Sequence, residues 1–304
     1  MMKCGGCISV AERKDGQVFT AGRSTLLLLA APVALLAMFL LVPLSLLLLV
    51  SFHRYDPRLI VSPVWTPENY LRFFGDPYYR NVLLYTLRIA GVTSGAALVI
   101  AYPLAYFLAR TTSRFKGWCV FLLLAPLMVG IIVRTYGWLV VLGREGTINS
   151  LLLSMGVIHA PLRLLYTNGA VTLGLIEVLL PYMVLPLLSA IQKVDRSVED
   201  AARSLGAPPA DVFRHILLPL SVPGILTGVV IVFTLSAGAI VTPALLGSPR
   251  SQTMGTLIYQ LMTATLNWPF GSSAAFILLA FEALPTIVLL TLIQGRPIRL
   301  EALR

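Results

Sequence analysis

Residues 170–219 contain the pattern that decides the fold. An apolar run, AVTLGLIEVLLPYMVLPLLSAIQ (170–192), precedes a charged stretch that includes SVEDAARSLGAPPADVFRHILLP (197–219). The run is long enough to cross a bilayer as a helix, which takes about 20 apolar residues. The stretch 193–215 is too polar for the hydrocarbon core, and a new apolar run begins at Ile216. We therefore predict two membrane-spanning helices joined by a structured loop.

The same alternation continues toward both ends of the chain. The predicted spans are 26–52, 82–109, 117–142, 170–192, 221–246 and 272–294. Of the 304 residues 57% are hydrophobic and only 12% are charged, about half the charged share of an ordinary soluble domain. The first run is too long for a signal-peptide core and lacks a clear cleavage site, so we expect it to be retained. The predicted fold is all-α: one membrane domain of six transmembrane helices (26–295) between tails at 1–25 and 296–304.

The distribution of Lys and Arg predicts the orientation. If the N-terminus is cytoplasmic, the inner segments hold the larger share of the cations, as the positive-inside rule requires. Both tails and the loop 193–220 are then cytoplasmic, and the chain is a multi-pass protein of the cell (inner or plasma) membrane in contact with lipid. The segment 53–80 is external, and its many aromatic residues suit a short helix at the interface.

The loop at 197–219 has the local chemistry of two short helices separated by a break. Ser197 can cap the first helix, with Asp200 as its reciprocal partner. Gly206 stands where a helix can stop in a left-handed conformation. Pro209 can begin the second helix, and we expect Pro219 to end it. Such a pair at the membrane surface is a natural docking element for a partner protein.

This loop resembles the EAA loop of ABC importer permeases. The family pattern is E-A-A, three residues, G, nine residues, then I-x-L-P. The residues on that spacing are Asp200, Ala201, Ala202, Gly206, Ile216, Leu218 and Pro219. Asp200 replaces the usual glutamate, and the adjacent Glu199 is a candidate to share its role. The resemblance implies that these residues dock a separate ATPase.

A wider resemblance links the chain to the spermidine/putrescine permease subunits. The stretches that carry it are WTPENY (65–70), RTYGW (134–138), LPYMVLPL (180–187), VTPALLG (241–247) and NWPFG (267–271). The resemblance implies a type I importer permease that moves a small solute, with a polyamine as first candidate and other small solutes as the alternative. It also implies three protein partners: an ATP-binding subunit dimer, a second permease subunit and an extracytoplasmic solute-binding protein.

No phosphate-binding GxxxxGK[ST] motif occurs in the sequence, so ATP is expected to bind to the partner ATPase. We predict no catalytic residue, metal site or cofactor in this chain, because its three histidines lie in separate segments. Cys4 and Cys7 form a CxxC near the N-terminus, but no second pair accompanies them, and two free thiols are the simpler interpretation. The cations are scattered, which argues against nucleic-acid binding.

Two acids interrupt apolar spans. Glu177 and Glu282 are each costly in a membrane unless they face a wet cavity or a partner. One hypothesis places them in the translocation pathway, where they attract a cationic solute. The alternative is a helix–helix pair, for example with Arg134 or Arg88, or a protonated acid hydrogen-bonded between helices. Both alternatives stay open from the sequence.

Two rival interpretations of the whole chain remain. A secondary transporter of the inverted-repeat type would show internal repeats, of which we find none, and would need no docking loop. A membrane scaffold without transport activity is the second. Copurification of an ATPase that depends on 197–219 separates these two interpretations from the importer permease.

Two GxxxG spacings, Gly91/Gly95 and Gly224/Gly228, permit close helix contact.

Overall fold

The computed structural model describes residues 23–248 and 252–294. The chain divides into two units, residues 1–47 and 48–304. Most of helix α1 (Arg23–Ser51) belongs to the first, and it covers the first predicted span. The tails predicted at 1–25 and 296–304 lie, apart from the start of α1, outside the described residues, as do Cys4 and Cys7.

The segment that follows α1, in the second unit, contains two strands and a short helix. Strands β1 (His53–Asp56) and β2 (Ile60–Trp65) pair antiparallel, and helix α2 (Glu68–Gly75) follows. The buried Asn69 amide donates 2.8 Å hydrogen bonds to the carbonyls of Ser51 and His53, which fixes α2 against the hairpin. The aromatic residues predict the short helix correctly, whereas the hairpin is not among the sequence-based expectations.

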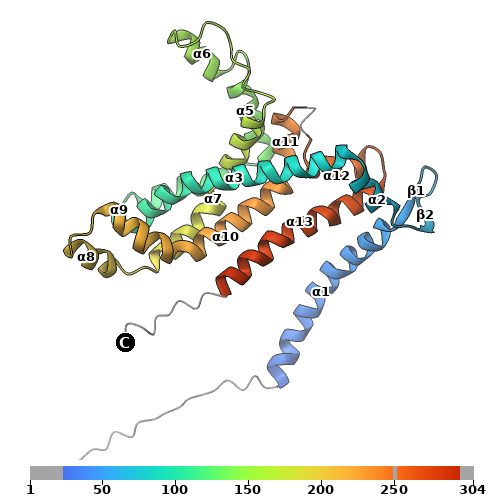
Figure 1. The fold of residues 1–304 in the computed structure, drawn as a ribbon, viewed down its shortest axis with the longest axis horizontal. Coiled ribbons are helices and arrows are strands. Elements are labelled where there is room, and N and C mark those ends of the chain that lie inside the picture. Colours follow the sequence, from blue (N-terminus) through green and yellow to red (C-terminus); the bar gives the residue numbers. More distant parts are fainter. Residues whose placement is uncertain (1–22, 249–251, 295–304) are drawn as a thin grey trace, which may run out of the picture. The chain divides into compact units, whose positions relative to one another are not determined.

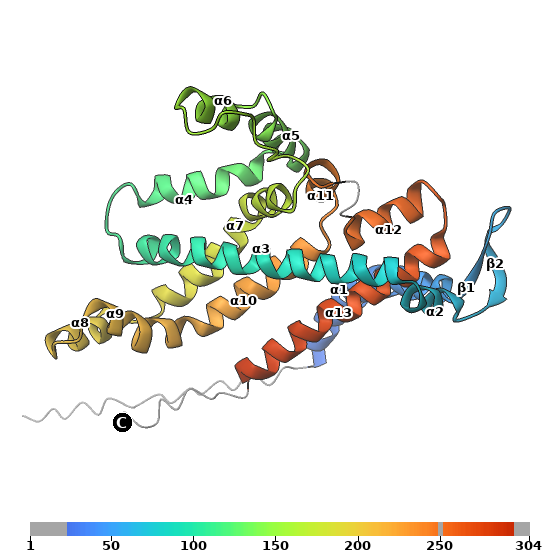
Figure 2. The ribbon, with the colours of Figure 1, turned by 45° about the horizontal axis from the view of Figure 1, so that its top comes forward.

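Long helices form the core of this unit. They are α3 (Pro77–Arg110), α7 (Asn168–Gln192), α10 (Leu218–Ala237) and α13 (Trp268–Gln294). Figures 1 and 2 show α3, α7 and α10 side by side, with α13 next to α10. Fully buried Ala97, Ala101 and Ala105 on α3 allow close approach to α7. The 25 residues of α7 span about 37 Å, enough to cross the bilayer.

The third predicted span is not one helix. It consists of α4 (Lys116–Leu124), a 3₁₀ turn η1 (Ala125–Met128) and α5 (Ile131–Leu142), with a 98° bend between its halves. Pro126 lies in the turn and Gly130 is extended (φ −56°, ψ 139°), so the helical hydrogen bonds cannot continue. By length and composition the described helices provide five candidate spans, or six if this bent pair counts as one.

The fifth predicted span, 221–246, extends beyond the helix that it was meant to describe. Helix α10 ends at Ala237, with Gly238 as its C-cap, and a separate helix α11 (Val241–Leu246) packs against α5 and α7. Two further short helices do not follow from the hydropathy pattern. These are α6 (Thr147–Ser154) and α12 (Met254–Thr263), the latter opened by a capping box between Thr253 and Thr256.

The loop after α7 contains α8 (Arg196–Ser204), α9 (Pro209–Val212) and a π-helical turn η2 (Phe213–Leu217) that runs directly into α10. In Figure 1, α8 and α9 lie at one end of α3, whereas α5 and α6 project away from its side.

Candidate functional site: docking loop and intramembrane acids

Helix α8 begins earlier than its predicted cap. Asp195, not Ser197, is the N-cap, and its carboxylate accepts a 2.9 Å hydrogen bond from the Ser197 N–H. That bond holds the pKa of Asp195 below its usual value. Asp200 takes no part in the cap, because it lies more than one turn beyond Asp195 along the helix. The predicted Ser197–Asp200 capping pair is therefore wrong.

Helix α8 ends as predicted, at Gly206. The residue has φ +87°, in the left-handed region that favours glycine. Its N–H donates to the Arg203 carbonyl at 2.9 Å, and the Ala207 N–H donates to the Ala202 carbonyl at 3.1 Å. This hydrogen-bond pair is the Schellman ending of a helix, which turns the chain sharply toward α9.

The second helix begins at Pro209, as predicted, but Pro219 does not end it. The segment 209–237 is helical throughout, with the π turn η2 between α9 and α10. Leu218 N–H bonds to the Phe213 carbonyl, five residues back. This wider turn directly before Pro219 leaves room for the proline ring, which an ordinary α-helical turn lacks.

One face of the loop is free within the described part of the chain. Asp200, Ala201 and Gly206 are exposed, and the apolar Leu205 is 89% exposed. Ala202 and Ile216 are half-buried, and Leu218 and Pro219 are exposed. An exposed leucine beside small residues and a carboxylate is a compact surface for another protein.

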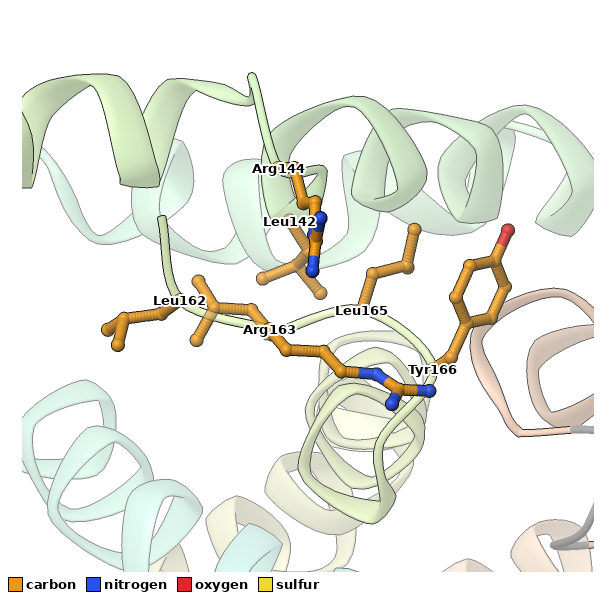
Figure 3. A pocket seen from close by; sticks show the side chains of 7 residues that line it. Leu142, Arg144, Leu162, Arg163, Leu165 and Tyr166 are labelled. Carbon is orange, nitrogen blue, oxygen red and sulfur yellow. The ribbon is translucent and has the colours of Figure 1, made fainter. Parts of the chain in front are cut away.

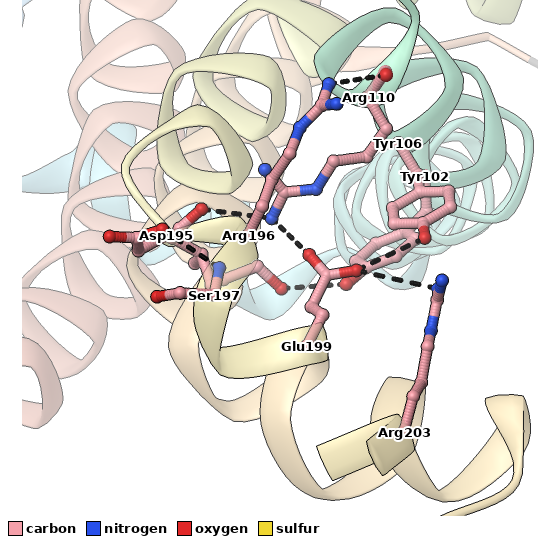
Figure 4. Close-up of polar contacts among 10 residues, drawn as sticks. Tyr102, Tyr106, Arg110, Asp195, Arg196, Ser197, Glu199 and Arg203 are labelled. Atoms are coloured by element: carbon pink, nitrogen blue, oxygen red, sulfur yellow. Dashed lines mark hydrogen bonds and ion pairs between the residues drawn. The ribbon is translucent and has the colours of Figure 1, made fainter. Parts of the chain in front are cut away.

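The opposite face of α8 is anchored to α3. Glu199 is buried, and its carboxylate pairs with the Arg110 guanidinium at the end of α3 (Figure 4). The Tyr106 hydroxyl donates to the same carboxylate at 3.4 Å, and Arg203 lies 3.9 Å from it. Burial removes Glu199 from the exposed face, so of these two adjacent acids Asp200 is the one that α8 presents outward.

The two intramembrane acids have different surroundings. Glu177 on α7 accepts from Arg134 on α5 at 3.3 Å, which is the ion pair that the sequence left open as one alternative. Glu282 on α13 is half-buried, and among the described residues its Oε1 has no hydrogen-bond partner. Arg134 therefore neutralises Glu177, whereas no described residue forms an ion pair with Glu282.

A pocket of about 400 Å³ lies at the end of α7 opposite the docking loop. Its walls are Leu142, Leu162, Leu164, Leu165 and Tyr166, with Arg144 and Arg163 reaching over it (Figure 3). The fully buried Asn149 holds this region together through hydrogen bonds with Gly143 and Leu162. The pocket does not follow from the sequence pattern, because its walls meet only where the chain returns on itself before α7.

The chain is similar to known transport proteins. Its residues 19–296 match the family described as "Binding-protein-dependent transport system inner membrane component". It is 35% identical to the spermidine/putrescine transport system permease protein PotB of Escherichia coli (strain K12), over 83% of this chain and 92% of that one. The PotB of Haemophilus influenzae is 36% identical over 82% of this chain and 87% of its own. The molybdenum permease ModB of Azotobacter vinelandii is 28% identical over 66% of this chain and 89% of its own.

Solved structures agree on the fold. A bacterial alginate ABC transporter, crystallised with its alginate-bound periplasmic protein, has a chain that superposes with a TM-score of 0.71 at 16% identity, covering 87% of this chain and 92% of that one. The type I importer permease fold and the multi-pass membrane architecture predicted from the sequence are thus confirmed. The chain belongs to the binding-protein-dependent transport system inner membrane components, the permease subunits of ABC importers.

Proposed function

We propose that this permease moves a polyamine such as spermidine or putrescine, and that a separate ATPase docked on α8 and α9 drives the movement. The docking loop is the observation that supports the energy source. Its exposed residues, Asp200, Ala201, Leu205 and Gly206, all lie in the second half of α8 or directly after it. The sequence has no phosphate-binding loop of its own, so ATP belongs to the partner.

The cargo proposal draws on the relatives and on one side chain. PotB proteins at 35–36% identity carry spermidine and putrescine in their names, and Glu282 is an acid within a membrane helix that forms no ion pair with the described residues. A partly buried carboxylate in a membrane helix favours a cationic partner, because an unpaired charge there is costly. ModB, a more distant relative, is named for molybdenum, so another small solute is the alternative cargo.

The full importer would contain two ATPase chains, a second permease and an extracytoplasmic solute-binding protein. The two ends of α7 suit these partners, with the docking loop after Gln192 and the arginine-lined pocket before Asn168. In this arrangement the docking loop 193–220 and both termini are cytoplasmic.

Cysteine labelling tests that orientation. In a variant without native cysteines, a cysteine at Ser62 in β2 is expected to react with a membrane-impermeant maleimide in intact cells. Cysteines at Ser113 and Ser197 are expected to react only after the membrane is permeabilised, because Ser113 follows the end of α3 that contacts α8, and Ser197 lies in α8 itself. Labelling of Ser113→Cys and Ser197→Cys in intact cells, with Ser62→Cys protected, would reverse the topology.

Uptake measurements test the cargo. In cells that express the whole importer, Glu282→Gln is expected to weaken the apparent affinity for spermidine by about 10- to 150-fold, since a hydrogen bond to a charged group contributes about 1.5–3 kcal/mol. The amount of assembled complex should stay unchanged, because the Glu282 carboxylate Oε1 has no hydrogen-bond partner among the described residues.

Glu177→Gln is the comparison. It leaves Arg134 as an unpaired cation in the membrane, so we expect less assembled complex rather than weaker affinity. Unchanged spermidine uptake by Glu282→Gln would remove this acid from the pathway. No polyamine uptake by the wild type would contradict the cargo while leaving the permease assignment in place.

A further inference from the structure

Three residues at the end of α3 form a stripe along one helix face. Tyr102, Tyr106 and Arg110 are spaced four residues apart, so they project from the same side of α3. Each contacts the loop 193–220 or the start of α10, and more than 80 residues separate the two partners of every contact in the sequence (Figure 4). We call this set the α3 stripe.

The Arg110 end of the α3 stripe holds α8. Arg110 pairs with Glu199, and the two side chains are only 15% and 5% exposed. The Arg110 guanidinium also donates to the Val194 carbonyl at 3.1 Å, and Arg196 donates back to the Arg110 carbonyl. The α3 stripe thus contacts the Glu199 side chain within α8 and also the Val194 backbone, which precedes α8. Removing one partner of such a buried pair leaves an uncompensated charge, which is strongly unfavourable.

The Tyr102 end of the α3 stripe contacts the other half of the segment. Its ring lies edge-on to Phe213, with centroids 5.2 Å apart, at the first residue of the π turn. Its hydroxyl shares a 2.9 Å hydrogen bond with the buried Ser221 hydroxyl of α10. Phe213 belongs to the π turn, and π turns are frequent where a helix serves a function.

We propose that the α3 stripe is the coupling surface that transmits the position of the docking loop to the membrane helices. Glu199 and Arg110 act in it as positioning residues, and neither contacts solute or ATP. The proposal rests on the proposed docking of an ATPase at the exposed face of α8. It follows from the division of α8 into a free face, with Asp200 and Leu205, and a clamped face, with Glu199.

Among the described residues, the Arg110–Glu199 pair is the one ion pair that joins α8 to the core helices. Short connectors, 193–195 and 205–208, join α8 to its neighbours along the chain. Since α3 packs along both α7 and α10, a displacement of α8 that keeps the Arg110–Glu199 pair intact carries the end of α3 with it. Loss of the pair should let α8 follow the ATPase while the membrane helices stay behind.

The test measures solute transported per ATP hydrolysed by the complete importer in proteoliposomes. Glu199→Gln and Arg110→Gln are each expected to keep the ATPase bound but to lower this ratio by about tenfold or more, within the range of known coupling effects. Arg114→Gln is the control. Arg114 is an exposed arginine beyond the end of α3 that forms no ion pair with the described residues, and its ratio should match the wild type.

A double variant separates coupling from a purely structural role. Arg110→Gln with Glu199→Gln leaves no unpaired buried charge, so membrane insertion should return to the wild-type level even if either single variant folds poorly. Its transport per ATP should remain low. A wild-type ratio in the inserted double variant would overturn the coupling role of the α3 stripe. Failure of any ATPase to copurify with the wild type would instead overturn the docking proposal beneath it.

Discussion

Gly206→Glu is expected to leave the chain inserted in the membrane but to abolish transport and solute-stimulated ATP hydrolysis. Gly206 has φ +87° and forms the Schellman ending of α8. A side chain there costs about 1–2 kcal/mol of backbone strain, and it places a carboxylate beside the exposed Leu205 on the docking face. A Cβ at Gly206 meets no atom within 4 Å, so the core of the chain is undisturbed. ATPase activity of the purified importer and solute uptake are the measurements.

Gly156 provides a matched control for this substitution. It has φ +69°, ends α6 with the same pair of hydrogen bonds, and also has open space around a Cβ. Gly156→Glu therefore adds the same charge and comparable strain at a site away from α8. We expect Gly156→Glu to retain the bound ATPase. A Gly206→Glu chain that is inserted normally and transports at the wild-type rate would show that α8 is not the docking element.

Gly224→Ala is expected to reduce the amount of folded chain in the membrane severely. A Cβ at Gly224 would lie 2.4 Å from the Ala190 Cβ and 2.8 Å from the Pro186 carbonyl oxygen, closer than real contacts allow. Helices α7 and α10 would have to separate along one of the largest interfaces of the bundle. Overpacking of this kind costs up to about 3 kcal/mol, or about a hundredfold in the ratio of folded to unfolded chain.

The other GxxxG spacing supplies the comparison. A Cβ added at Gly91 or Gly95 would meet no atom within 4 Å, and both glycines are exposed in this chain. Gly91→Ala should therefore leave the amount of folded chain unchanged when the two variants are compared by fluorescence size-exclusion in detergent. Equal yields of Gly224→Ala and Gly91→Ala would contradict the tight α7–α10 contact.

The two GxxxG pairs also show what a sequence motif leaves undetermined. Both have the same spacing, yet only Gly224 and Gly228 lie against another helix, where Gly228 faces Met183. A spacing identifies a face that permits contact, but the identity of the neighbour depends on how the chain returns to it. That information lies in the tertiary packing of the helices and not in the local sequence.

Hydropathy predicts the number and positions of the spans well, because burial in lipid dominates the choice of residues. It fails at the breaks. The run 117–142 bends at Pro126 and Gly130, and the run after Ile216 ends one helix at Gly238 and begins another at Val241. Apolar residues continue through both breaks, so an average over a window does not detect them.

The conformation of the loop 193–220 was predictable in part from its residue pattern, including the left-handed Gly206 and the helix start at Pro209. The different roles of its two adjacent acids, Glu199 and Asp200, could not be predicted from the sequence. The family spacing identifies Asp200, whereas the buried pair with Arg110 involves Glu199, and the partner lies 89 residues earlier in the chain. Similarly, the pairing of Glu177 with Arg134 was one of several alternatives, and only the packing of α5 on α7 selects it.

Purification of the chain from its native membrane tests the central claim most directly. We expect an ATPase to copurify with it, and ATP hydrolysis by that complex to rise when a spermidine-loaded solute-binding protein is added. Hydrolysis by a complex built on Gly206→Glu should not respond. A chain that purifies alone and, in proteoliposomes without ATP, accumulates solute in response to an ion gradient would contradict the account.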